Sequence, residues 1–136
     1  MTKYIYSLTT IPSRINNIDD TIASLLNQTK KSDKIILNVP KNYNFRFANT
    51  NIDMLSIKKK YSNNITINEL DNDYGPGTKL LGLFENSILE NENTDDTFII
   101  LVDDDQIYRN YMIKYFNNYN EKYYKNKLSV ASFYCH

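Results

Sequence analysis

Three consecutive aspartates, Asp103, Asp104 and Asp105, directly follow an apolar run at residues 98–102. An apolar run of this length is typical of a strand that is buried on both faces, as in a parallel sheet. Adjacent carboxylates repel one another, and a divalent cation such as Mg²⁺ or Mn²⁺ would relieve that repulsion. Because alternate residues of an extended segment share a face, we expect Asp103 and Asp105 to be the metal ligands and Asp104 to point away. The alternative is a polar strand end in which one aspartate caps the next helix.

A second candidate segment, residues 73–79, reads DYGPGTK. Its glycines allow a ligand to approach the backbone closely, and a helix is expected to begin directly after it. Helix N-termini bind anions, yet Lys79 places a cation in this first turn, where it opposes the helix dipole. A bound phosphate would explain that arrangement, and the alternative is a plain turn with a solvated lysine. Neither a P-loop nor a G-x-G-x-x-G fingerprint is present.

A third candidate segment, residues 9–14, follows the first expected strand and contains Thr9, Thr10 and Arg14. Two hydroxyls and a guanidinium there could contact a base, a ribose or a phosphate, and the alternative is a loop that only leads into a helix. The one histidine, His136, stands at the end of the sequence. The sequence therefore gives little support to a Ser-His-Asp or Cys-His catalytic arrangement.

The elements that must position these segments alternate between strand and helix. We expect strands at residues 3–8, 34–39, 65–68, 98–102 and 128–134. We expect helices over residues 52–61 and 109–125, and two more that begin near Asn17, as an N-cap, and near Thr78. The apolar stripes of three of them are Ile18, Ile22, Leu25 and Leu26; Leu80, Phe84 and Ile88; and Met112, Phe116, Tyr119 and Tyr123. This alternation predicts an α/β fold with a largely parallel sheet, in which ligands bind at the carboxyl ends of the strands.

The composition excludes several function classes. Sixteen basic residues balance sixteen acidic ones, so no overall charge favours nucleic acid or an anionic membrane surface. No apolar run approaches the roughly 20 residues that span a bilayer. The lone cysteine, Cys135, excludes an intrachain disulfide and suits a reducing compartment. For a sequence of 136 residues we expect one domain, located in the cytoplasm.

Taken together, residues 7–14 (SLTTIPSR), 73–79 (DYGPGTK) and 101–105 (LVDDD) resemble the GT-A-fold glycosyltransferases. The resemblance is to the small family-2-like enzymes of large DNA viruses, of the chlorella virus type, and of some bacteria, and it covers nearly the whole chain. It implies a Rossmann-like GT-A sheet, mostly parallel and flanked by helices, that forms one nucleotide-sugar-binding domain over residues 1–136. It also implies transfer of a hexosyl group from a UDP-sugar with Mn²⁺ or Mg²⁺, in the cytoplasm of a host or in a virion.

The same resemblance implies roles for individual residues. The loop from Thr9 to Arg14, with Asp71 or Asp73, would hold the nucleoside, and Lys79 would neutralise the diphosphate. Asp103 would face the ribose or the metal, and Asp105 would coordinate the metal that stabilises the departing diphosphate. The implied nucleotide-binding set is Thr9, Thr10, Ile11, Arg14, Asp71, Asp73, Gly75, Lys79, Asp103 and Asp104, and the implied metal ligands are Asp103 and Asp105.

The sequence departs from that family in its later part. Family members continue further and there supply the acceptor site and a general base, but no carboxylate follows Glu121 here. The catalytic residue is therefore unknown, and we expect either a truncated chain or a partner chain that supplies the rest. The alternative function is a non-catalytic nucleotide-sugar-binding module. A sugar nucleotidyltransferase is disfavoured, because that class needs a glycine-rich loop where this chain has residues 9–14.

Overall fold

A computed structural model describes residues 2–43, 46–47, 50–93 and 95–123 of the chain. The four strands are β1 (Lys3–Thr9), β2 (Lys34–Pro40), β3 (Thr66–Leu70) and β4 (Thr97–Leu101). The four α-helices are α1 (Asp19–Leu26), α2 (Met54–Tyr61), α3 (Thr78–Glu85) and α4 (Met112–Tyr123). Two short 3₁₀ helices, η1 (Ile15–Asn17) and η2 (Gly75–Gly77), precede α1 and α3.

The strands form one sheet in the order β3-β2-β1-β4, and every neighbouring pair is parallel. This confirms the predicted α/β class with a parallel sheet. All four carboxyl ends therefore meet at one edge, where β1 leads into the 9–14 segment and β4 leads into the aspartates. The strand expected at residues 128–134 lies outside the described residues. Within the described residues, no helix is both long enough and apolar enough to cross a membrane.

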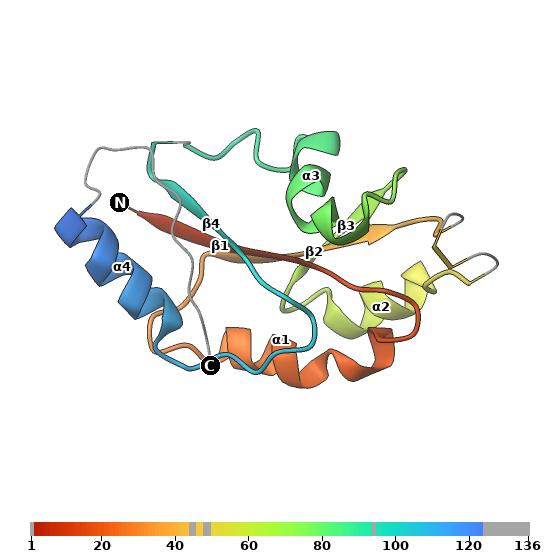
Figure 1. The fold of residues 1–136 in the computed structure, drawn as a ribbon, viewed down its shortest axis with the longest axis horizontal. Helices are drawn as coiled ribbons and strands as arrows, with labels where there is room; N and C mark the ends of the chain where they lie inside the picture. The colour runs from red at the N-terminus through yellow and green to blue at the C-terminus, as the bar shows by residue number, and fades with distance from the viewer. Residues whose placement is uncertain (1, 44–45, 48–49, 94, 124–136) are drawn as a thin grey trace.

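One face of the sheet carries the main hydrophobic core. Figure 1 shows α1, α2 and α4 on this side of the sheet and α3 on the other. Because side chains alternate along a strand, every second residue faces these helices. The strands contribute mainly Tyr4, Tyr6, Leu8, Ile35, Leu37, Val39 and Ile100, and the helices contribute Ile22, Leu25, Ile57, Tyr61, Met112 and Ile113.

The opposite face of the sheet, under α3, is largely polar in its centre. Ser7, Asn38 and Asn68 are all buried there, on three adjacent strands. Asn38 Nδ2 donates to Ser7 Oγ at 2.8 Å, and Asn68 Nδ2 donates to Asn38 Oδ1 at 2.9 Å. The helix joins this ladder because Ser7 Oγ donates to the carbonyl of Lys79 at 2.5 Å, and Asn68 Nδ2 donates to that of Gly82 at 3.0 Å. We call the hydrogen-bonded side chains of Ser7, Asn38 and Asn68 the asparagine ladder, after its two asparagines.

Gly82 allows α3 to approach the asparagine ladder closely. A Cβ at this position would lie 2.6 Å from Leu70 Cδ1 and 3.0 Å from Asn38 Oδ1. Both distances are shorter than ordinary van der Waals contact, so a larger residue would push the helix away from the sheet. The glycine therefore fixes the height of α3 above the strands.

Two predictions about the helices are wrong. The N-cap of α1 is Ile18 and not Asn17, because Asn17 belongs to η1. The apolar stripe of α3 does not face the sheet: Leu80 is 42% exposed and Phe84 is 69% exposed, and Ile88 lies beyond the helix end. The buried residues of α3 are Thr78, Gly82 and Leu83, because this helix meets the sheet through hydrogen bonds, a glycine and one leucine that packs on Ile5 and Ile36.

Candidate functional site

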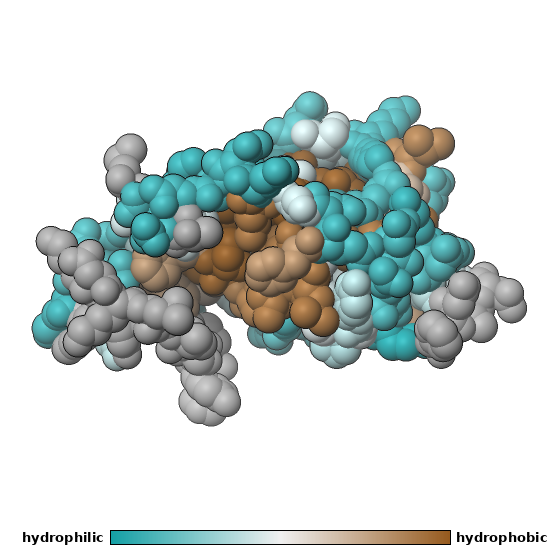
Figure 2. Space-filling model, turned by 90° about the horizontal axis from the view of Figure 1, so that it is seen from above, coloured by the Kyte–Doolittle hydropathy of each residue, from teal (hydrophilic) through white to brown (hydrophobic). Residues whose placement is uncertain are grey.

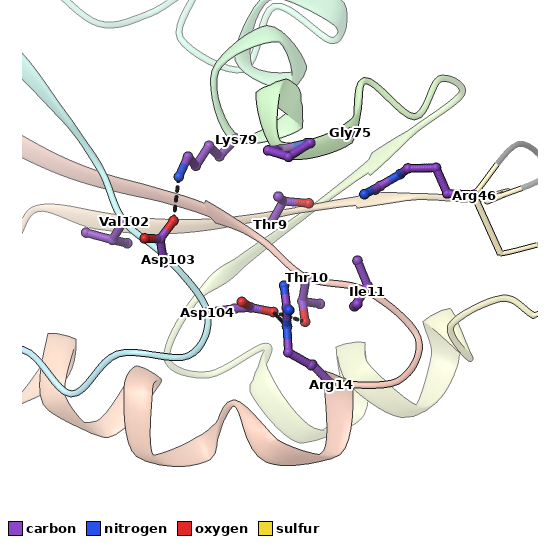
Figure 3. A pocket seen from close by; sticks show the side chains of 11 residues that line it. Thr9, Thr10, Ile11, Arg14, Arg46, Gly75, Lys79, Val102, Asp103 and Asp104 are labelled. Carbon is purple, nitrogen blue, oxygen red and sulfur yellow. Dashed lines mark hydrogen bonds and ion pairs between the residues drawn. The ribbon is translucent and has the colours of Figure 1, made fainter.

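A pocket lies at the carboxyl ends of β1 and β4, beside the start of α3 (Figure 3). All three segments singled out by sequence contribute to it. Its volume is about 80 Å³, whereas small-molecule sites usually begin near roughly 300 Å³. The pocket is therefore smaller than an ordinary small-molecule site. The lining residues are Thr9, Thr10, Ile11, Arg14, Arg46, Gly75, Pro76, Lys79, Val102, Asp103 and Asp104.

Asp104 joins the end of β4 to the segment after β1. Its carboxylate accepts hydrogen bonds from Thr10 Oγ1 at 2.6 Å and from Arg14 Nε at 3.0 Å. Its backbone carbonyl accepts one from Thr21 Oγ1 at 2.9 Å. Asp104 is only 4% exposed, so these partners compensate the cost of burying its charge. The Asp104 carboxylate also raises the pKa of Arg14, through its hydrogen bond to the guanidinium.

The predicted alternation of the three aspartates is wrong at Asp104. It lies against the pocket and does not point away from it. Alternation holds only in an extended chain, but β4 ends at Leu101, and Asp104 and Asp105 lie in a turn. Asp105 is exposed and is not among the residues that line the pocket.

Lys79 and Asp103 form an ion pair at one end of the pocket. Lys79 Nζ lies 2.6 Å from Asp103 Oδ1, and the Asp103 side chain is 59% exposed. Tyr108 Oη accepts a hydrogen bond from the backbone N–H of Asp103 at 2.7 Å. The hydroxyl of Ser7 holds the Lys79 backbone through its carbonyl, so the asparagine ladder positions this cation. A cation and an exposed carboxylate thus share the strand ends, as the sequence predicted.

The turn before α3 is held by Asp73, whose side chain is 5% exposed. Asp73 Oδ1 accepts the N–H of Gly75 at 2.9 Å, and Gly75 has φ +65°, a conformation that favours glycine. Arg46 binds both carboxylate oxygens, through Nε at 2.9 Å and Nη2 at 2.8 Å. Burial raises the pKa of Asp73, but the hydrogen bonds from Arg46 and Gly75 outweigh it and hold that pKa below its usual value.

Two further residues change the predicted site. Asp71 is 75% exposed and pairs with Lys41 at 2.9 Å, and neither side chain lines the pocket. Arg46 does line the pocket, and the sequence analysis missed it. It stands in a polar loop with no motif around it, so nothing local indicated that it would bind Asp73, 27 positions away.

The carboxylates of this site fit a hard divalent cation only with help from a ligand. Among the described residues, no three His, Cys, Asp or Glu side chains gather closely enough to hold a metal ion. Mg²⁺ commonly takes one or two carboxylates and completes its shell with substrate phosphates and water. The exposed Asp103 fits that arrangement.

Comparison with known proteins supports the fold. No protein-family profile and no curated protein matches this chain. A similar solved structure is that of residues 1–349 of S. aureus TarS, with a TM-score of 0.59 and 19% sequence identity. The match covers 96% of this chain and 39% of that chain, so the chain spans about two fifths of the TarS structure. The protein therefore has a mixed α/β fold, with an all-parallel four-stranded sheet flanked by helices, that is similar to the fold of the TarS structure.

Proposed function

We propose that this domain binds a nucleotide sugar and serves as the donor half of a metal-dependent glycosyltransferase, with a UDP-sugar as the donor. The observation that carries the proposal is the convergence of three distant segments on one pocket. These segments end β1, begin α3 and end β4, and they bring Thr9, Lys79 and Asp103 together. The similarity to the TarS fold supports sugar transfer as the reaction class.

Several residues in and beside the pocket have proposed roles. Lys79 binds the diphosphate, because it is the cation at the start of α3, where helix N–H groups also favour an anion. Asp103 faces the ribose or holds the Mn²⁺ or Mg²⁺, with Asp105 as a second ligand. When bound, the metal would offset the negative charge that develops on the departing nucleoside diphosphate. The segment from Thr9 to Ile11 lies against the nucleoside.

An alternative function is a nucleotide-sugar-binding module that does not transfer the sugar. The small pocket favours it, since its volume is below that of an ordinary small-molecule site. Both functions predict the same donor site. They differ in turnover, because only the transferase releases UDP from a UDP-sugar when an acceptor, or water, is present.

The experiment is titration calorimetry of UDP and UDP-glucose with and without Mn²⁺. We expect binding that requires Mn²⁺, at least tenfold weaker binding to Lys79→Ala, and loss of this Mn²⁺-dependent binding in Asp103→Asn and Asp105→Ala. The matched control is Lys41→Ala, because Lys41 also pairs with an aspartate but lies outside the pocket. No binding by the wild-type protein with Mn²⁺ would contradict the proposal. Release of UDP, assayed in parallel, separates the transferase from the binding module.

A further inference from the structure

Arg46 occupies the end of the pocket away from Lys79 (Figure 3). Thr9 lies between these two cations in that view, and the guanidinium of Arg46 points inward. The side chain is fixed on two sides. Its Nε and Nη2 donate to the two carboxylate oxygens of Asp73, an arrangement that we call the fork. Its guanidinium carbon lies 5.1 Å from the centre of the Phe47 ring. Arg46 is thus held in place before any ligand arrives.

The charge of Arg46 is balanced within the protein. Its partner Asp73 is only 5% exposed and binds through both carboxylate oxygens. Lys79 differs, because its partner Asp103 is 59% exposed and accepts from it through one oxygen. A phosphate or a metal can therefore rearrange the Lys79 pair more easily than the Arg46 pair. Arg46 offers a ligand directed N–H groups rather than an uncompensated positive charge, and such groups can donate to a neutral acceptor such as a carbonyl oxygen.

A guanidinium carries five N–H donors, and two of the five serve Asp73. The other three lie on the part of the group beyond this fork. Donors placed in this way match carbonyl oxygens on the edge of a nucleobase, and arginine commonly recognises such an edge. An exocyclic amino group at the same position would place its N–H donors against the N–H donors of Arg46. No hydrogen bond could form, so such a base would bind more weakly.

We propose that Arg46 reads the nucleobase of the donor and selects a base with a carbonyl group, as in uracil or guanine, over one with an amino group there, as in cytosine or adenine. This inference rests on the proposed function. If the diphosphate lies at Lys79 and Asp103, the nucleoside extends past Thr9 and brings its base to Arg46. Asp73 then acts as a positioning residue, which orients the guanidinium and does not itself contact the base.

The experiment measures the affinities of UDP, CDP, GDP and ADP for the wild-type protein, Arg46→Lys and Arg46→Ala, with Mn²⁺ present. At position 4 of the ring UDP carries a carbonyl group and CDP an amino group, and the neighbouring N3 is protonated only in UDP. GDP and ADP repeat that contrast at position 6 of a purine, where GDP also carries a 2-amino group. We expect the wild type to bind UDP at least tenfold more tightly than CDP, and GDP more tightly than ADP. Arg46→Lys keeps the charge but loses the fork, so we expect its preference to fall below about threefold while its affinity for CDP stays within about threefold.

Lys41→Ala is the control, and we expect it to keep the wild-type preference. Far-UV circular dichroism and urea unfolding establish that each variant is folded. Equal weakening of UDP and CDP in Arg46→Ala, with both affinities kept in Arg46→Lys, would show that Arg46 contributes charge alone. Equal affinities in the wild type would show that it reads no carbonyl group. Either result overturns this inference but leaves the proposed function standing. Failure of the wild type to bind any of the four nucleotides would overturn both.

Discussion

The two faces of the sheet are built differently. The face toward α1, α2 and α4 buries aliphatic and aromatic side chains from almost every element of the fold. The face toward α3 buries the asparagine ladder and only a small apolar cluster around Ile5, Ile36 and Leu83. The ladder ends at the backbone of Lys79, in the pocket. The face toward α1, α2 and α4 therefore supplies most of the stability, and the face toward α3 positions Lys79 in the pocket.

The α3 side also leaves apolar residues in contact with solvent. Figure 2, which views the molecule from this side, shows a hydrophobic area among the polar residues. The exposed apolar residues of α3 and the neighbouring β4 include Leu80, Leu81, Phe84 and Leu101. Their burial cannot be what holds α3 on the sheet. Hydrogen bonds, the close approach at Gly82 and the one buried leucine, Leu83, hold it instead.

The largest expected effect of a single substitution is on the apolar face. Leu37 is fully buried in the main core, so Leu37→Ala removes contacts and leaves a cavity. We expect the free energy of unfolding to fall by about 2–5 kcal/mol. Urea unfolding followed by circular dichroism measures it. A loss below about 1 kcal/mol would contradict the inference that the apolar face supplies most of the stability.

The next residue of the same strand tests the opposite face. Asn38→Ala removes the hydrogen bonds to Ser7, Leu8 and Asn68. We expect a loss of about 1–3 kcal/mol, because buried partners are left unpaired. We also expect weaker nucleotide binding than in Leu37→Ala, since the ladder positions Lys79. Calorimetry on both variants, at a temperature where each is folded, makes the comparison, and equal affinities would refute the positioning role.

The pH dependence of the free energy of unfolding tests the ion pair between Asp73 and Arg46. The pKa of Asp73 is held below its usual value by Arg46 and Gly75, so the folded state gains stability above the unfolded pKa of about 3.9. That contribution is lost as the pH falls through the lower folded pKa. Between pH 5 and pH 3 we expect the wild type to lose about 1 kcal/mol more stability than Arg46→Ala, which lacks the pair. Urea midpoints across this range test it, and parallel curves would count against it.

The smallest expected effect is that of substituting Phe84 in α3, which we compare with its neighbour Leu83. Phe84 is 69% exposed and Leu83 is 1% exposed. We expect Phe84→Ala to change the free energy of unfolding by less than about 0.5 kcal/mol. Leu83→Ala, which opens a cavity, serves as the matched control and should cost about 2 kcal/mol or more. If the two losses were similar, Phe84 would be covered in solution.

The features that could be predicted from sequence were local ones. The four described strands and the three segments at their ends each have a pattern within a few residues, and the parallel sheet gathers them at one edge. The stripe at Leu80 and Phe84 gave the wrong face of α3, because periodicity shows which residues share a face but not what covers it. Asp104 was misplaced because the chain turns directly after β4.

The features that could not be predicted join residues far apart in the chain. Arg46 binds Asp73 across 27 positions, and Asn38 binds Ser7 across 31. A lone arginine in a polar loop and a single asparagine in an apolar strand carry no periodic signal. Their pairing depends on the strand order, which the chain establishes only when it folds.

The apolar surface beside α3 affects how copies of the protein meet in solution. Charge repulsion ordinarily keeps proteins apart, but sixteen positive and sixteen negative side chains leave no net charge at pH 7. Leu80 and Phe84 of α3 and Leu101 of β4 are exposed. An exposed apolar surface attracts further chains. Colloidal stability therefore limits the protein concentration near neutral pH, and mildly alkaline buffers, in which the chain is negatively charged, keep the molecules dispersed.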